Sequence, residues 1–232
     1  MMEPGFYNMD CMEAMMQFPD RFFDLAIVDP PYGINADTFN NGSGASKDKA
    51  VYGTNARLRK EGRLNHGCGK LKGRPFNNSN CSWDFKPPPR EYFQELFRVS
   101  KNQVIWGGNY FDLPPTRGIA IWDKMQPWEN FSQAEIAWTS FDKPALIFRM
   151  SNTMSGKIHP TQKPVKLYQW ILSRYAKEGD KILDTHVGSA SSLIAFHRGG
   201  YAYWGFEIDP AYFQSAMKRL EEEKMQVSMF DK

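Results

Sequence analysis

Apolar residues recur along this chain in two patterns. Short apolar runs with the length of buried strands cover residues 23–29, 103–106, 118–122, 135–139, 145–149, 181–184 and 201–207. Longer stretches with apolar residues at helical spacing cover residues 11–18, 89–99, 164–177, 190–198 and 210–225. Buried strands that alternate with amphipathic helices are typical of a parallel sheet covered on both faces. The sequence therefore predicts a doubly wound α/β fold with a mostly parallel, seven-stranded sheet.

Residues 34–90 interrupt this alternation. They show no sustained period of either kind and contain Gly42-Ser43-Gly44, which is typical of a loop or an insertion. A chain of 232 residues with 41% hydrophobic content can bury one sizeable core and is short for two. We therefore predict a single domain over residues 1–232, with residues 34–90 as an insertion.

The insertion is strongly basic. The whole chain has a net charge of +3, whereas residues 47–90 carry +8 and the remainder about −5. Such a segment fits either a solvated surface loop or a surface that neutralises DNA phosphates. On the second interpretation the DNA-contacting residues are Arg57, Arg59, Lys60, Arg63, Lys70, Lys72 and Arg74.

Several other classes of protein are disfavoured. The chain has no run of about 18 apolar residues and no secretory signal at its N-terminus, so we expect a cytoplasmic protein without a membrane partner. The cysteines Cys11, Cys68 and Cys81 lack CxxC spacing and are expected to be free thiols. His66 with two of them is a zinc alternative, but it lacks a fourth ligand, and we predict no metal. No phosphate-binding G-x-x-x-x-G-K-[ST] string occurs.

The tetrapeptide Asp29-Pro30-Pro31-Tyr32 follows the buried run 23–29 directly. In open α/β sheets, ligands bind just beyond the carboxyl ends of strands. Proline fixes the backbone and has no N–H, so the Asp29 carboxylate and the Pro30 carbonyl form a pair of acceptors. An exocyclic amine such as adenine N6 offers two donors to such a pair, and Tyr32 could stack on the base. The same tetrapeptide also fits an ordinary surface turn.

A second group of polar residues follows the runs 181–184 and 201–207. Asp184 is followed by a turn with Gly188 and Ser189 and then by a helix, a geometry that offers backbone N–H groups to a polar ligand. Glu207 ends the next run, and an acid at that place suits ribose hydroxyls. Taken alone, an ordinary strand-to-helix connection explains the turn equally well.

Together these strings resemble a family, the amino-methyltransferases that act on DNA adenine N6 or cytosine N4. Their order here is the circularly permuted one, with the catalytic motif ahead of the cofactor motif. The resemblance covers about residues 6–33 and 81–220. The matching strings begin at Asn8 (Asn-Met-Asp), Asp29 (Asp-Pro-Pro-Tyr), Val104 (Val-Ile-Trp-Gly-Gly-Asn), His159 (His-Pro-Thr-Gln-Lys-Pro), Lys181 (Lys-Ile-Leu-Asp) and Gly205 (Gly-Phe-Glu-Ile-Asp).

The resemblance implies a Rossmann-like, S-adenosylmethionine-dependent methyltransferase of a bacterium, an archaeon or a phage. Its substrate would be double-stranded DNA, in which it methylates N6 of a flipped adenine. In the family, Asp at the position of Asp29 goes mostly with adenine and Ser mostly with cytosine N4, and Asn accompanies RNA or glutamine substrates. Catalysis is assigned to Asp29, Pro30, Pro31 and Tyr32. Cofactor binding is assigned to Asp10, Asp29, His159, Thr161, Lys163, Asp184, His186, Gly188, Ser189, Glu207 and Asp209.

Three of these residues, Lys163, His159 and His186, have interpretations other than direct contact with the cofactor. Lys163 either faces the cofactor carboxylate or simply begins a helix. His159 and His186 are interpreted as packing or hydrogen-bonding residues, because an amine that attacks a sulfonium methyl needs no strong base. Cytosine N4 remains an alternative target.

The chain departs from the family in two places. The family has Asp-Pro-Phe-x-Gly-Ser-Gly at the cofactor turn, whereas this chain has Asp184-Thr-His-Val-Gly-Ser-Ala190. A DNA-binding relative with weak catalysis is therefore a further alternative. Only residues 150–158 lie where relatives place target recognition, so that role is assigned to the basic insertion. A short recognition segment also favours a homodimer, and a restriction enzyme as partner is left open.

Overall fold

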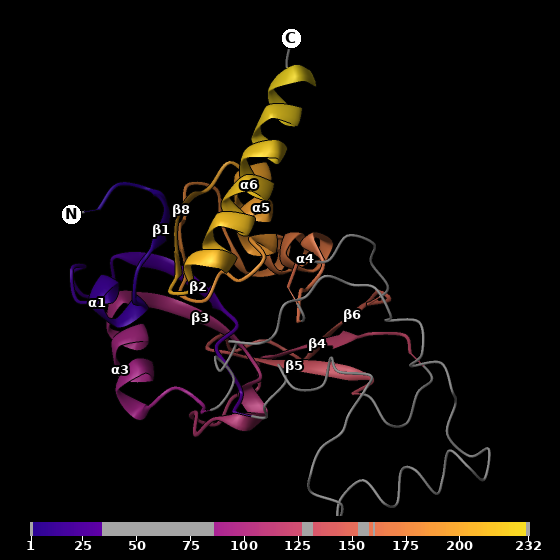
Figure 1. Cartoon of the computed structure of the whole chain (residues 1–232). Helices are drawn as coiled ribbons and strands as arrows, with labels where there is room; N and C mark the ends of the chain where they lie inside the picture. Colours follow the sequence, from indigo (N-terminus) through magenta and orange to yellow (C-terminus); the bar gives the residue numbers. More distant parts are fainter. Residues whose placement is uncertain (1, 34–85, 127–131, 153–157, 160, 231–232) are drawn as a thin grey trace, which may run out of the picture.

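The computed structural model describes residues 2–33, 86–126, 132–152, 158–159 and 161–230 (Figure 1). Its strands are β1 (Gly5–Asn8), β2 (Phe23–Val28), β3 (Ser100–Trp106), β4 (Ile119–Asp123), β5 (Ala134–Thr139), β6 (Leu146–Arg149), β7 (Lys181–Asp184) and β8 (Ala202–Glu207). Its helices are α1 (Cys11–Met15), α3 (Arg90–Val99), the short 3-10 helix η3 (Gly108–Tyr110), α4 (Val165–Tyr175), α5 (Ser191–Arg198) and α6 (Pro210–Phe230). The basic insertion up to residue 85 lies outside the described residues.

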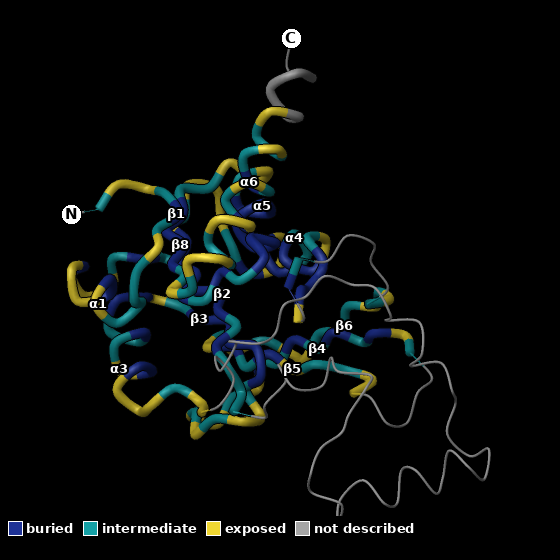
Figure 2. The backbone as a smooth tube through the Cα atoms, in the orientation of Figure 1, coloured by how far each residue is buried: buried dark blue, intermediate teal, exposed yellow. Residues whose placement is uncertain are grey.

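The strands form one sheet in the order β1-β8-β7-β2-β3-β5-β4-β6. Helices α1 and α3 cover one face, and α4, α5 and α6 cover the other (Figure 1). Strand β2 contributes to both cores, since Leu25 and Ile27 pack toward α4 and α5 while Ala26 and Val28 pack toward α1 and α3. Burial accordingly follows the sheet and the inner faces of the helices (Figure 2). The predicted doubly wound, mostly parallel α/β fold is confirmed.

The sheet has one strand more than the sequence predicted. Strand β1 has four residues, of which Phe6 alone is buried, so its sequence contains no apolar run. It pairs in parallel with β8 at the edge of the sheet, with Gly5 opposite Trp204. An edge strand needs few buried side chains because one of its sides has no neighbouring strand, which is why an apolar pattern did not reveal it.

The direction of the strands determines which ends meet at the site. Strands β1, β8, β7, β2 and β3 are parallel, so their carboxyl ends lie along one edge. Strand β5 runs antiparallel to both β3 and β4, and its first residues therefore lie at that same edge. The edge thus gathers Asp10, Glu207, Thr185, Asp29 and Glu135 from five separate strands or the loops that follow them.

None of the helices in the described segments is long and apolar enough to cross a membrane.

The five predicted helices all occur, with ends that differ by a few residues from the predicted ones. The largest difference is in α6, which continues to Phe230. The helices therefore serve mainly to bury the two faces of the sheet.

Candidate active site

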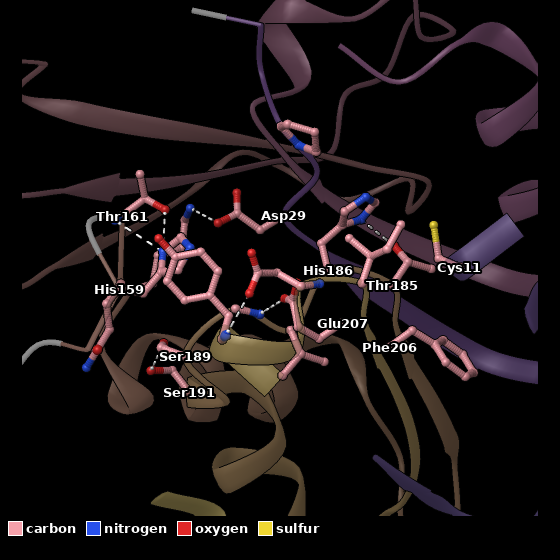
Figure 3. Close-up of a pocket in the computed structure, with 18 of the residues that line it drawn as sticks. Cys11, Asp29, His159, Thr161, Thr185, His186, Ser189, Ser191, Phe206 and Glu207 are labelled. Atoms are coloured by element: carbon pink, nitrogen blue, oxygen red, sulfur yellow. Dashed lines mark hydrogen bonds and ion pairs between the residues drawn. The ribbon is translucent and has the colours of Figure 1, made fainter. Parts of the chain in front are cut away.

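A pocket of about 260 Å³ lies at the edge where the carboxyl ends of β1, β8, β7 and β2 meet (Figure 3). Residues that the sequence singled out and that line it are Asp10, Asp29, Pro31, His159, Thr161, Lys163, His186, Gly188, Ser189, Glu207 and Asp209. The lining also includes residues that the sequence did not single out, among them Cys11, Gln162, Tyr168, Thr185, Phe206, Ile208 and Tyr212. Pro30, Tyr32 and Asp184 are not part of the lining.

Glu207 ends β8 and holds the neighbouring turns in place (Figure 3). Its carboxylate accepts hydrogen bonds from the Gly188 N–H at 2.9 Å and from the Asp209 N–H at 3.0 Å. Burial raises the pKa of Glu207, and these hydrogen bonds oppose the rise. A carboxylate has about four lone-pair sites, so Glu207 keeps acceptor capacity toward the pocket.

Asp184 lies beneath the turn that follows β7, and only 2% of it is exposed. One of its carboxylate oxygens accepts the His186 N–H at 3.0 Å, and the other accepts the Ser192 hydroxyl at 2.5 Å. Burial raises the pKa of Asp184 to about 7. Asp184 therefore organises the turn and the start of α5 from behind, and does not itself form the pocket wall.

Of the two histidines of the pocket, His159 is buried and His186 is half-buried. The ring of His159 packs on Tyr212 at 4.5 Å between centroids, and its Nδ1 lies 3.1 Å from the Thr161 hydroxyl. Nδ1 of His186 lies 2.9 Å from the Thr185 hydroxyl. Burial lowers the pKa of both histidines to about 4. Both rings are therefore neutral near pH 7, in keeping with packing and hydrogen-bonding roles.

The atypical end of the cofactor turn is supported by its surroundings. Ala190 adopts a left-handed backbone, with φ at 58°, although this conformation favours glycine. Its side chain is fully buried in the core that contains α5. Arg219 of α6 donates to the Ser189 carbonyl at 2.5 Å and to the Ser191 hydroxyl at 2.9 Å. Tertiary contacts thus hold the turn without the glycine that the family has there.

Asp29 is the centre of a compact polar cluster just after β2. The Tyr32 hydroxyl donates to Asp29 Oδ1 at 2.6 Å, and the Lys163 ammonium contacts Oδ2. Lys163 also lies 3.0 Å from a carboxylate oxygen of Glu135. Burial raises the pKa of Asp29, and the charge of Lys163 opposes this rise. To the two alternatives for Lys163, the structure thus adds a third: its ammonium neutralises Asp29.

The ring of Tyr32 is enclosed on several sides. Tyr110 stacks on it with 4.9 Å between ring centroids and 14° between planes, and the Lys163 ammonium lies 5.7 Å from its centroid. Gly107 has φ at 71°, and a Cβ at this position would lie 2.2 Å from the Tyr32 ring. Stacking of a base on Tyr32 stays a prediction, because in this arrangement Tyr110 covers one face of the ring.

Comparison with known families identifies the chain. Residues 101–218, just over half of the sequence, match the profile of the family described as DNA methylase (N6_N4_Mtase). The chain belongs to the DNA methylase family. The matched part of the chain includes Glu135, Lys163 and Glu207, whereas the loop from Asp29 to Tyr32 precedes it.

Individual relatives agree with this placement. The type II methyltransferase M2.DpnII of Streptococcus pneumoniae is 29% identical over 145 residues. That alignment covers 62% of this chain and 51% of the relative, so the chain spans about half of the relative's length. The sequence similarity to this relative therefore concerns about half of its length.

Solved structures share the fold. The M1.HpyAVI–SAM complex has a TM-score of 0.54 at 18% identity, with 92% of this chain and 98% of that chain covered. PvuII DNA methyltransferase, described as cytosine-N4-specific, has a TM-score of 0.56 at 14% identity, with 96% and 90% covered. At these identities the similarity concerns the Rossmann-like fold.

Sequence reasoning missed Glu135, Lys124 and Tyr110, which take part in the ion pairs and ring contacts around Asp29 and Tyr32. Glu135 lies within an apolar strand pattern, and only the antiparallel direction of β5 brings it to the site. The predicted DNA contacts, and His66, Cys68 and Cys81 of the zinc alternative, lie outside the described residues. Among the described residues, no cluster of three or more His, Cys, Asp or Glu side chains has an arrangement suited to a metal.

Proposed function

We propose that this DNA methylase transfers a methyl group from S-adenosylmethionine to N6 of a flipped adenine in double-stranded DNA. The observation that carries the proposal is that Asp29 and Glu207 line one pocket (Figure 3). Glu207, at the end of β8, is placed to accept hydrogen bonds from the ribose hydroxyls of a nucleoside. Asp29, after β2, is placed to accept a hydrogen bond from an amine. A cofactor and an acceptor amine bound to these two acids would therefore meet within a single cavity.

The residues of the pocket fit the cofactor. Glu207 keeps acceptor sites for ribose hydroxyls, since a carboxylate has about four lone-pair sites and the backbone N–H groups of its neighbours do not fill them all. Beside it, Ile208 lines the pocket and is 63% exposed, which gives the adenine ring an apolar surface. When bound, S-adenosylmethionine supplies an electrophilic methyl group on a sulfonium. Glu207 and Ile208 would hold its adenosine part.

Asp29 has room for a substrate donor in spite of its present partners. Oδ1 accepts one hydrogen bond from Tyr32, and Oδ2 accepts one from Lys163. Because each carboxylate oxygen has two lone pairs, one site on each oxygen is left for an amine N–H. The Tyr32 and Lys163 contacts hold the carboxylate in a single orientation, which is what a positioned acceptor requires.

The proposed reaction depends on orientation. A base in a duplex cannot present its amino group to a pocket, so the adenine must be flipped out. Asp29 and the Pro30 carbonyl would accept the two N–H bonds and aim the nitrogen lone pair toward the methyl donor. Transfer makes the nitrogen cationic, and its surplus proton would pass to Asp29, whose pKa burial raises.

The choice of adenine depends on Asp29. In the family that the chain resembles, aspartate at this position goes mostly with adenine, and serine mostly with cytosine N4. Cytosine N4 is the second candidate, and the similarity of fold to PvuII DNA methyltransferase supports it. Incubation of DNA with the protein and S-adenosylmethionine, followed by nucleoside mass spectrometry, distinguishes the two. N6-methyladenine supports the proposal, and N4-methylcytosine replaces it by the alternative.

The first prediction concerns Asp29→Asn. Asparagine keeps the size of the side chain but loses the charge and one acceptor oxygen, so we expect turnover to fall by roughly 10²- to 10³-fold. Cofactor affinity, measured by calorimetry, should change little, because Glu207 holds the adenosine part. Turnover close to that of the unmodified protein, with intact cofactor binding, would show that Asp29 does not have this role.

A DNA-binding relative without catalysis is the remaining alternative, and the alanine at position 190 is the feature that favours it. Cofactor calorimetry in the presence of duplex DNA separates the two. Saturable binding supports the enzyme, and no binding supports the inactive relative. A homodimer stays a prediction, and a restriction-enzyme partner stays an open question.

A further inference from the structure

Asp29 is the last of four charged side chains of alternating sign that form a continuous line of ion pairs. Lys124 Nζ lies 2.6 Å from Glu135 Oε1, and Lys163 Nζ lies 3.0 Å from Glu135 Oε2. Lys163 in turn contacts Asp29 Oδ2. The Lys163 side chain is only 3% exposed, and the other three are largely buried. Two cations and two anions thus neutralise one another away from bulk water.

The fold brings these four residues together from separate segments. Lys124 directly follows β4, and Glu135 is the second residue of β5, where it pairs with Trp122 in the antiparallel register. Lys163 lies just before α4, which packs on the sheet, and Asp29 directly follows β2. Glu135 therefore links the β4–β5 part of the sheet to the lysine that contacts the catalytic loop.

Lys163 needs such a link because its side chain is long. A lysine stem has many rotamers, and an ammonium held by one carboxylate alone can shift while the pair stays intact. With carboxylates at Asp29 and at Glu135, the ammonium is held between two anions. Lys124 contributes the fourth charge, so that Glu135 is not left as an excess negative charge beside the site.

We propose that Glu135, held by Lys124, is a positioning residue that fixes the Lys163 ammonium against Asp29 and thereby orients the carboxylate for the target amine. The proposal rests on the methyl-transfer function and deepens it. Glu135 is not part of the pocket lining, so its influence on the reaction passes through Lys163 and Asp29.

The line of charges predicts that the pKa of Asp29 shifts in opposite directions in two variants. Glu135 raises the pKa of Asp29, and Lys163 lowers it. Glu135→Gln leaves Lys163 with Asp29 as its anionic partner, so the pKa of Asp29 should fall. Lys124→Met leaves the charge of Glu135 less compensated, so the pKa of Asp29 should rise. Among the described residues, the titratable groups that interact with Asp29 include Tyr32, Tyr92, Glu135, Lys163, Tyr168 and Asp184.

The experiment combines a titration without cofactor and a kinetic measurement. The Asp29 carboxyl carbon is followed by ¹³C NMR against pH in the unmodified protein, in E135Q, in K124M and in the double variant. Opposite shifts in E135Q and K124M, and a smaller shift in the double variant, support the proposal. Because this titration needs no methyl transfer, it decides the proposal even if the protein methylates nothing.

The kinetic measurement distinguishes positioning from a structural role. In E135Q we expect kcat to fall on the order of 10- to 100-fold, with KM for the cofactor little changed and the acidic limb of kcat/KM at lower pH. Asp142→Asn is the control, since Asp142 belongs to an exposed ion pair with Arg117. An unchanged Asp29 titration, or equal losses of kcat and cofactor affinity at every pH, would overturn the proposal. If E135Q does not fold, K124M alone decides by the sign of its shift.

Discussion

Asp184 illustrates how a single residue can differ from the role that its motif indicates. Its carboxylate is buried and satisfied by the His186 N–H and the Ser192 hydroxyl, behind the wall of the pocket. An ionised carboxylate in that place has lost most of its hydration, and two hydrogen bonds only partly replace it. The ionised form of Asp184 should therefore lower the free energy of unfolding.

Stability should depend on pH through Asp184. Burial raises its pKa from the ordinary 3.8 to about 7, so the folded protein binds this proton more tightly than the unfolded chain. The contribution is therefore fully present below about pH 4 and is lost as the pH rises to about 7. Asp184→Asn keeps an acceptor for the His186 N–H and carries no charge. We expect its free energy of unfolding, relative to the unmodified protein, to increase between pH 4 and 8 by on the order of 1–4 kcal/mol.

Denaturant titration at several pH values measures this difference. If the free energies of unfolding of the unmodified protein and of Asp184→Asn followed parallel curves against pH, folding would not raise the pKa of Asp184. Glu222→Gln serves as a control, because Glu222 is exposed on α6 and its removal should leave the pH dependence unchanged.

At the scale of elements, the turn after β3 positions the loop from Asp29 to Tyr32. Gly107 follows Trp106 with φ at 71°, and its N–H donates to the Ile136 carbonyl of β5 at 2.8 Å. The ring of Tyr32 lies directly against this glycine, and the Tyr32 hydroxyl reaches Asp29. The turn therefore defines the space in which the loop from Asp29 to Tyr32 lies.

Gly107→Ala should disturb the loop from Asp29 to Tyr32 as well as the backbone at position 107. Alanine in a left-handed conformation costs about 1–2 kcal/mol, and here its Cβ would also overlap the Tyr32 ring. Gly179 is a matched control, since its φ is 81° and a Cβ there would meet nothing within 4 Å. We expect both variants to lose stability, but only G107A to lose turnover, by roughly 10-fold or more. Equal turnover in both would show that the position of Tyr32 does not depend on Gly107.

At the scale of the whole molecule, charge is unevenly distributed along the chain. Residues 47–90 carry +8, and the remainder carries about −5. A surface that neutralises phosphates releases counterions, and its DNA affinity falls with salt in proportion to the number of phosphates that it neutralises. The predicted DNA contacts belong to this basic segment, so we expect them to determine the salt dependence of binding.

Neutralising Arg57, Arg59, Lys60 and Arg63 to glutamine should weaken DNA binding and flatten its salt dependence. The slope should change by about one unit for each phosphate that is no longer neutralised. Fluorescence anisotropy with duplex DNA across salt concentrations measures the slope. Arg117→Gln with Lys218→Gln is the control, because both side chains are exposed on other parts of the molecule. An unchanged slope in the fourfold variant would assign DNA binding to another surface.

Much of the fold and part of the site follow from local sequence. Each strand of the sheet except β1 was predicted, because a buried strand repeats apolar residues within a few positions. The pocket residues Asp29, Gly188 and Glu207 were found for a related reason. They end short predicted strands or lie in the turns after them, and the carboxyl ends of parallel strands lie at one edge. Asp10, which follows the unpredicted strand β1, was assigned only from the resemblance to the family.

The tertiary structure decided what depends on contacts between distant segments. It placed Asp184 behind the pocket, and it joined Lys163 both to Asp29, which is 134 positions away in sequence, and to Glu135. The reversed direction of β5, which brings Glu135 to the site, leaves no trace in an apolar period. A local pattern records which residues are buried, whereas register, strand direction and the pairing of buried charges are properties of the assembled sheet.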